Sequence, residues 1–306
     1  MTYREKFQRL PGNVRGAVWL MLGGLCWTVV TIFIKLLGQR LDSLQVAFFR
    51  GLFGLMFIIP MLLRYRFAPL RSTRHVGHFW RAALGTTSMS LGFYAVTHLP
   101  LADATSLGFT TPLFVLVVAA LFLGEKVRWR RWSATAVGFL GVVLMMRPGQ
   151  AAFDPIMLLA LLGAALTACA VSVVKNLTAT ESTMTMLATF TLWSTLFMAG
   201  PAFVVWRQPT LAEWALAAGM GILATIGQSF IIRAYSAGDA SAVAPFDYLR
   251  LPLSVLAGLW MFGEPVSWWT LGGAGVIVTA TLYIARREAR LGIKVSPEVK
   301  SGKIGP

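Results

Sequence analysis

The chain alternates between long apolar runs and short segments that hold most of its charged residues. A helix that crosses a bilayer needs about 20 predominantly apolar residues. Ten runs reach or approach this length, so the pattern predicts ten membrane-spanning helices. Their predicted ranges are 16–38, 43–63, 77–97, 101–123, 131–146, 155–175, 183–205, 211–233, 239–262 and 267–286.

Composition supports an all-α integral membrane protein. The 306 residues are 57% hydrophobic and only 13% charged, whereas a soluble domain has roughly 25% charged residues. Such a chain has too few polar side chains to cover a water-facing surface. The first apolar run is too long for the core of a cleaved signal peptide, so we interpret it as the first span.

The net charge of +15 could indicate a nucleic-acid partner, but the position of the charges argues against one. If the N-terminus is cytoplasmic, segments on the inside hold 21 of the 27 lysines and arginines, and those on the outside hold four. Positive residues flank spans on the cytoplasmic side. The asymmetry predicts that both termini are cytoplasmic, including a basic tail over residues 287–306.

Matching residues recur at nearly constant offsets and indicate an internal repeat. They are Gly124-Glu125 and Gly263-Glu264 (offset 139), Lys35 and Lys175 (140), and Pro60 and Pro201 (141). The chain therefore divides into two halves of five spans, 16–147 and 155–286. Five is odd, so the second half enters the membrane from the opposite side. Inverted repeats around a central cavity are typical of secondary transporters that work by alternating access.

Three charged residues stand out because they lie well inside predicted spans, where a charge is costly and usually faces a cavity or a partner. They are Arg50 in the second span and Asp247 and Arg250 in the ninth. Asp247 and Arg250 are three residues apart and share a helix face. Two interpretations stay open: a structural ion pair, or a charged wall of a solute site. Arg50 either joins this site or extends to the membrane surface.

Other polar and aromatic residues in the spans are candidates for the lining of a solute site. Ser90 and Tyr94 lie in the third span and Gln228 in the eighth, where small and polar residues also mediate helix packing. Trp27, Trp193, Phe246 and Tyr248 could stack on a flat ring or face the lipid. Glu125 and Glu264 follow helix-ending glycines and are candidates for gating contacts or for caps.

Signatures of enzymes are missing from the sequence. No HExxH, P-loop or GxSxG motif is present, and the two cysteines, Cys26 and Cys169, lie in apolar runs without metal-binding spacing. The sequence predicts no enzyme activity, no cofactor and no metal site.

Several segments together resemble the EamA-domain ten-helix group of the drug/metabolite transporter superfamily. They are FFRG in the second span, GFYAVTHLPLADAT between the third and fourth, LFLGEKVRWRRW, APFDYLRLP and WMFGEPVSWWT. The resemblance implies a bacterial inner-membrane transporter of a small organic metabolite, such as S-adenosylmethionine, riboflavin, an amino acid or a metallophore. Small multidrug resistance relatives couple protons through a glutamate in their first helix. The first span here has no acidic residue, so Asp247 is the remaining candidate for proton coupling.

Two alternatives to transport stay open at this point. A scaffold or assembly protein would need a stable partner, and a lipid-modifying enzyme would need a polar cluster at one interface. Substrate, direction, coupling ion and a homodimeric state are not determined by the sequence.

Overall fold

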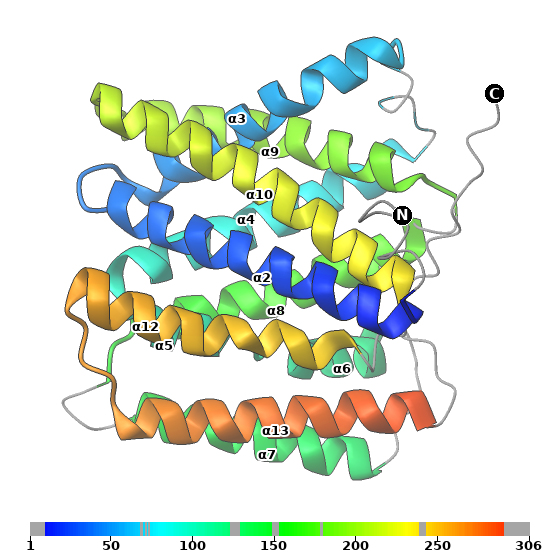
Figure 1. Ribbon diagram of the computed structural model, residues 1–306, viewed down its shortest axis with the longest axis vertical. Helices are drawn as coiled ribbons and strands as arrows, with labels where there is room; N and C mark the ends of the chain where they lie inside the picture. Colours follow the sequence, from blue (N-terminus) through cyan, green and yellow to red (C-terminus); the bar gives the residue numbers. More distant parts are fainter. Residues whose placement is uncertain are drawn as a thin grey trace.

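The computed structural model describes residues 10–290, except 68–69, 71, 73, 123–128, 149–152, 178–179 and 239–242. Every regular element in this part of the chain is a helix (Figure 1). The helices are α2 (Gly12–Leu37), α3 (Ser43–Arg64), α4 (His75–His98), α5 (Leu101–Gly108), α6 (Thr111–Phe122), α7 (Trp129–Met146), α8 (Ile156–Leu177), α9 (Thr183–Val204), α10 (Leu211–Ala237), the 3-10 helix η2 (Ala244–Leu249), α12 (Arg250–Phe262) and α13 (Trp268–Arg290).

These elements account for the ten predicted spans, of which the fourth is interrupted and the ninth changes from a 3-10 to an α-helix. Six stretches are long and apolar enough to cross a membrane, and two shorter apolar helices lie within α7 and α13. All the helices run roughly parallel or antiparallel to one another (Figure 1). The predicted all-α membrane fold is confirmed.

The fourth span, predicted as one helix over 101–123, breaks between α5 and α6. Pro112 has no N–H to donate to the carbonyl of Gly108, four residues earlier. The Thr111 hydroxyl donates to that carbonyl instead, at 2.9 Å, and the Thr110 hydroxyl donates to the carbonyl of Leu107 at 2.6 Å. Threonine side chains thus replace the lost backbone donor, as a helix break inside a membrane requires.

The ninth span begins, within the described residues, as the 3-10 helix η2 and continues as α12. It ends at Gly263, whose φ of 63° lies in the left-handed region that glycine adopts without strain. The N–H of Glu264 then closes the helix end on the carbonyl of Gly258 at 3.0 Å. This geometry turns the Glu264 side chain back toward α12.

The two repeats interleave in the fold. α2 and α3 pack chiefly against α10 and α9, whereas α4 packs along α8 and α7 along α13 (Figure 1). Each of these pairs joins a helix of one half to a helix of the other. The largest buried cluster collects residues from both halves: Val30, Phe49, Phe93, Met198 and Met220.

α2 begins and α13 ends at the same end of the bundle (right in Figure 1). α13 continues to Arg290, so the tail predicted from residue 287 begins with four helical residues. The rest of that predicted tail lies outside the described residues.

Candidate functional site

The side chain of Trp27, on α2, carries two arginines near its ring. The guanidinium carbon of Arg50, on α3, lies 5.6 Å from the ring centroid, and that of Arg250, at the start of α12, lies 5.9 Å from it. A tryptophan face attracts cations because of its quadrupole. The structure therefore brings together residues from the first, second and ninth spans.

Arg250 pairs with Asp247 across one turn, with Nη1 3.7 Å from Oδ2. Both side chains are partly buried, at 27% and 30% exposure. The stem of Arg250 crosses α2 at Gly24, where an added methyl group would lie 3.1 Å from its Cγ. The predicted pair exists, and a glycine on the neighbouring helix makes room for it.

Arg50 has a different environment from Arg250. Its Nη1 donates to the sulfur of Met89, on α4, at 3.1 Å, and a thioether is only a weak acceptor. Its Nε is buried and has no hydrogen-bond partner in the described residues. Arg50 thus points into the protein, toward Trp27 and Met89, and does not extend to the membrane surface.

Phe109 and Tyr248 bring the fourth and ninth spans together. Phe109 lies at the break between α5 and α6 and Tyr248 lies in η2, with ring centroids 4.9 Å apart at 64°. The offset of 139 that relates the two Gly-Glu pairs also relates these residues. The guanidinium carbon of Arg250 lies 6.0 Å from the Phe109 ring. The break in the fourth span and the 3-10 segment of the ninth, which belong to opposite repeats, therefore meet beside the charged group.

Three other predicted site residues lie near this group or in helix contacts. Gln228 follows Gly227 on α10, and a methyl group at Gly227 would lie 3.5 Å from Trp27 Cδ1. Ser90 is buried and donates to the carbonyl of Thr86 and to the sulfur of Met198, so it contacts α9. Tyr94 stacks on His98 near the end of α4, at a centroid distance of 4.1 Å.

Two predicted aromatic residues have other surroundings. Trp193, on α9, contacts the rings of Phe79 and Phe197 at 5.8 and 5.5 Å. Phe246, in η2, is 37% exposed. The described ring contacts of Trp193 are thus with an aromatic cluster and not with the charged group.

Glu264 joins the two repeats at the end of the bundle where α2 finishes. It forms an ion pair with Lys35, the last charged residue of α2. Lys35 also donates to the carbonyl of Leu99 at 2.7 Å, and Glu264 accepts the N–H of Leu101 at 2.7 Å. Both charged side chains are largely buried, at 12% and 13% exposure. We call these four residues the Lys35 clamp.

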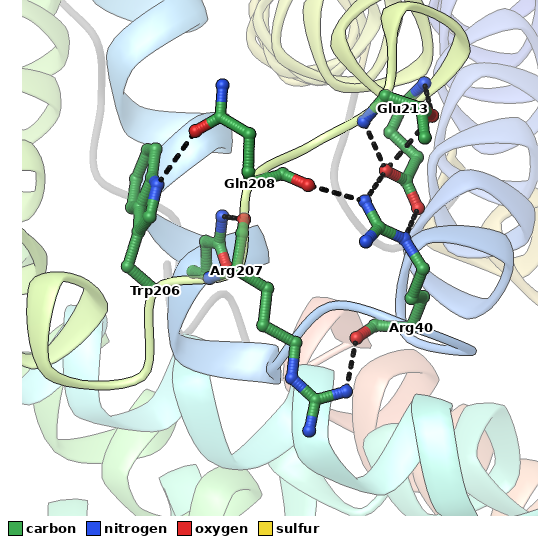
Figure 2. Close-up of polar contacts among 7 residues, drawn as sticks. Arg40, Trp206, Arg207, Gln208 and Glu213 are labelled. Atoms are coloured by element: carbon green, nitrogen blue, oxygen red, sulfur yellow. Dashed lines mark hydrogen bonds and ion pairs between the residues drawn. The ribbon is translucent and has the colours of Figure 1, made fainter.

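A second polar network at the same end ties the α2–α3 loop to the α9–α10 loop (Figure 2). Arg40 donates from Nε to Glu213 at 2.7 Å and from Nη2 to the carbonyl of Gln208 at 2.7 Å. Its hydrogen bond with Glu213 raises the pKa of Arg40 above its ordinary value. Buried Gln45 exchanges two hydrogen bonds with the backbone of Arg207. This end is closed by contacts between the repeats.

The opposite end has its own contact between the repeats. His78, on α4, is buried, with Nδ1 3.0 Å from the hydroxyl of Thr189 on α9 and Nε2 3.8 Å from the carboxylate of Glu181. The Ser72 hydroxyl donates to the same carboxylate at 2.6 Å. Glu125, predicted as a gating residue, lies outside the described residues.

Sequence reasoning missed Phe109, Met89 and Lys35 as parts of these arrangements. A signal existed for Phe109, because the repeat offset places it opposite Tyr248. Lys35 was recognised as a marker of the repeat but not as the partner of Glu264. Nothing in the sequence pattern distinguishes Met89 from other apolar residues of its span.

Comparison with known proteins identifies the family. The EamA-like transporter family matches residues 14–147 and, a second time, residues 154–286. The chain belongs to this family. The family predicted from the sequence motifs is therefore confirmed, and this EamA-like protein is a multi-pass membrane transporter.

Similar proteins of the family have names that state their solutes. The S-adenosylmethionine uptake transporter of Rickettsia prowazekii is 32% identical over 281 residues, which cover 92% of this chain and 96% of the relative. The riboflavin transporter of Rhizobium johnstonii is 35% identical over 283 residues, covering 90% and 93%. The pseudopaline exporter of Pseudomonas aeruginosa is 28% identical, covering 89% and 96%.

A solved crystal structure has the same fold at low sequence identity. It aligns with a TM-score of 0.62 and 18% identity, covering 90% of this chain and 98% of its own. The likeness supports the ten-helix arrangement of this EamA-like transporter.

Proposed function

We propose that this protein is a secondary transporter that moves a small organic metabolite across a bacterial inner membrane by alternating access. The supporting observation is the meeting of the broken fourth span of one repeat with the 3-10 segment of the ninth span of the other, at Phe109 and Tyr248. In inverted-repeat transporters, solutes bind near the midplane where broken helices of the two repeats meet. Arg250 lies beside this meeting point, over the Phe109 ring, and also over Trp27 together with Arg50; these three residues form the proposed solute site.

The two repeats, 16–147 and 155–286, are the proposed moving halves. Under the predicted topology the Lys35 clamp faces outward, so the described state is closed on the outside. Lys35 and Glu264 belong to different repeats, and an outward opening would separate them. The closed end is therefore the proposed external gate, with Glu264 as its gating residue.

The relatives' names suggest S-adenosylmethionine or riboflavin as first candidate solutes. One relative is named for uptake and another for export, so both directions belong in the first assay. Transport activity of these relatives favours a carrier over a lipid-modifying enzyme or a scaffold. We further propose cytoplasmic termini, including the basic tail, and Asp247 as the group that would bind a coupling proton.

The test is uptake by the purified full-length protein in proteoliposomes, with radiolabelled S-adenosylmethionine and riboflavin in separate experiments. We expect one solute to accumulate faster than in protein-free liposomes, and Arg250→Gln to reduce the initial rate at least about tenfold, because a buried charge that binds solute is lost. Absence of uptake and of counterflow for both solutes would reject them as substrates.

Arg233→Gln is the matched control. Arg233 also lies over a tryptophan, Trp19, at 5.3 Å, but it is exposed. It therefore reproduces the loss of an arginine–tryptophan contact without touching the proposed site. Its uptake rate should equal that of the unmodified protein. An equal loss in both variants would indicate a general effect of removing positive charge.

A further inference from the structure

Within the described part of the chain, Trp27, Arg50 and Asp247 each have a buried polar side-chain atom without a hydrogen-bond partner. Eight such side-chain atoms occur in the described part of the chain, and three of them are Trp27 Nε1, Arg50 Nε and Asp247 Oδ1. Buried polar atoms in native proteins nearly always have partners, so each exception requires an explanation. The residues that carry these three atoms are linked through Arg250, which lies near the Trp27 ring together with Arg50 and pairs with Asp247, so they offer unused hydrogen-bonding capacity to one polar ligand.

The chemistry of the three atoms defines what that ligand must supply. The Trp27 and Arg50 nitrogens are hydrogen-bond donors, and neither can act as an acceptor. They require an acceptor. The Asp247 oxygen is an acceptor and requires a donor or a positive charge. A ligand that satisfies all three atoms therefore has both a hydrogen-bond acceptor and a hydrogen-bond donor or positive charge.

The charges of the side chains at the site also favour a ligand with an anionic group. Arg50 and Arg250 both lie within 6 Å of the Trp27 centroid, so their guanidinium carbons are less than twice that distance apart. Asp247 pairs with Arg250, whereas among the described residues Arg50 donates to the weakly accepting sulfur of Met89. Two positive charges face one negative charge. An additional anion would relieve the repulsion between the arginines.

We infer, on the basis of the transport function proposed above, that the solute is a zwitterion whose carboxylate binds Arg50 Nε and Trp27 Nε1. Its cationic centre lies at the free Oδ1 of Asp247. A planar, uncharged solute would satisfy the donors only weakly and would leave the excess charge in place. Of the two candidate solutes, S-adenosylmethionine carries a carboxylate and cationic centres, and riboflavin carries neither.

The anion could also be the phosphate of a lipid head group. Arg50 is the eighth residue of α3, which places it roughly 10–12 Å along the helix from its start at a rise of 1.5 Å per residue. A free carboxylate therefore fits the position better than a head group at the membrane surface. Liposomes with and without anionic lipid separate the two sources.

The test measures binding and transport by the full-length protein with S-adenosylmethionine and with its decarboxylated form, which keeps the cationic groups but has no carboxylate. We expect the decarboxylated form to bind at least about tenfold more weakly, because the buried donors would stay unpaired. Arg50→Gln should abolish this preference, Arg50→Lys should retain part of it, and Arg233→Gln should leave it intact. Anionic lipid should not change the result.

Thermal unfolding separates ligand recognition from a structural role of Arg50. A buried charge without an acidic partner is destabilising, so Arg50→Gln should leave the unfolding midpoint unchanged or raise it in the absence of solute. A lower midpoint combined with unchanged solute preference would overturn the assignment.

The remaining outcomes distinguish failure of the proposed transport function from failure of the zwitterion assignment. If riboflavin is transported and Arg50→Gln has no effect, the transport function stands and the zwitterion assignment is wrong. If neither solute is transported, S-adenosylmethionine binding by detergent-purified protein still tests the site, and equal binding of the decarboxylated form, or no binding, overturns the assignment.

Discussion

Lys35 of the first repeat and Glu264 of the second form a largely buried ion pair that also binds both sides of the α4–α5 junction. The contact joins four helix ends, those of α2, α4 and α12 and the start of α5, through one pair of charges. Because each charge depends on the other, removal of one leaves the other buried and uncompensated.

This dependence predicts a strongly non-additive double-mutant cycle. Lys35→Met and Glu264→Gln should each lower the free energy of unfolding, and the double variant should recover part of the loss, with a coupling energy of about 1–3 kcal/mol. Arg40 and Glu213 provide the control, because Arg40 is 44% exposed and the coupling of an exposed pair should stay below about 1 kcal/mol. Denaturation of the purified protein measures both cycles. Additive effects at Lys35 and Glu264 would contradict the clamp.

Gly258→Ala should act through the Glu264 carboxylate. A methyl group at Gly258 would lie 2.7 Å from Glu264 Oε2, so it would displace the carboxylate from Lys35 and the Leu101 N–H. We expect a loss of stability in the native background. In a Glu264→Ala background the obstacle is gone, and alanine in a helix should stabilise by about 0.5–1 kcal/mol relative to glycine. The contact between Gly258 and the Glu264 carboxylate is supported if Gly258→Ala lowers the free energy of unfolding in the native background and raises it in the Glu264→Ala background.

Thr111→Val should destabilise the protein by about 1 kcal/mol, because the carbonyl of Gly108 loses the hydroxyl that replaces the missing Pro112 N–H. In a Pro112→Ala background the backbone N–H returns, and Thr111→Val should cost much less. Thr279→Val is the control, since the Thr279 hydroxyl bonds the Gly275 carbonyl within an uninterrupted helix. Equal costs for Thr111→Val and Thr279→Val would argue against a special role at the break.

The orientation in the membrane predicts opposite labelling of the two bundle ends. With Cys26 and Cys169 replaced by alanine, Gln208→Cys should react with an impermeant maleimide in intact cells. Arg64→Cys, at the end of α3, should react only after permeabilisation of the cytoplasmic membrane. Both parent side chains are exposed. The reverse labelling pattern would invert the proposed topology.

The fold could be predicted from the sequence because its determinants are local or periodic. Apolar run length and the distribution of arginines are enough to define spans, and constant offsets reveal the repeat. Arg50, Asp247 and Arg250 stood out because charge within an apolar run is rare. The helices agree with the predicted spans, and the two matches of the family agree with the predicted repeat.

Contacts between the repeats could not be predicted in the same way. The offset relates Lys35 to its twin Lys175, but it does not reveal that Lys35 pairs with Glu264, which follows a different helix. Trp27 and Trp193 are both tryptophans within apolar runs, so the sequence does not distinguish them. In the fold, Trp27 lies beside two arginines and Trp193 lies beside two phenylalanines. The break at Phe109 depends on how Thr110 and Thr111 satisfy the backbone beside Pro112.

The interleaving of the repeats has a consequence for biosynthesis. α2 is the first of the described helices to leave the ribosome, and its principal packing partner, α10, is completed 200 residues after α2 ends. At a synthesis rate of about 5–20 residues per second, this delay lasts on the order of ten seconds or more. During this time α2 and α3 lie in the bilayer without α9 and α10. The first half is therefore a membrane-inserted intermediate that waits for the second, and the complete core forms only after most of the chain has been translated.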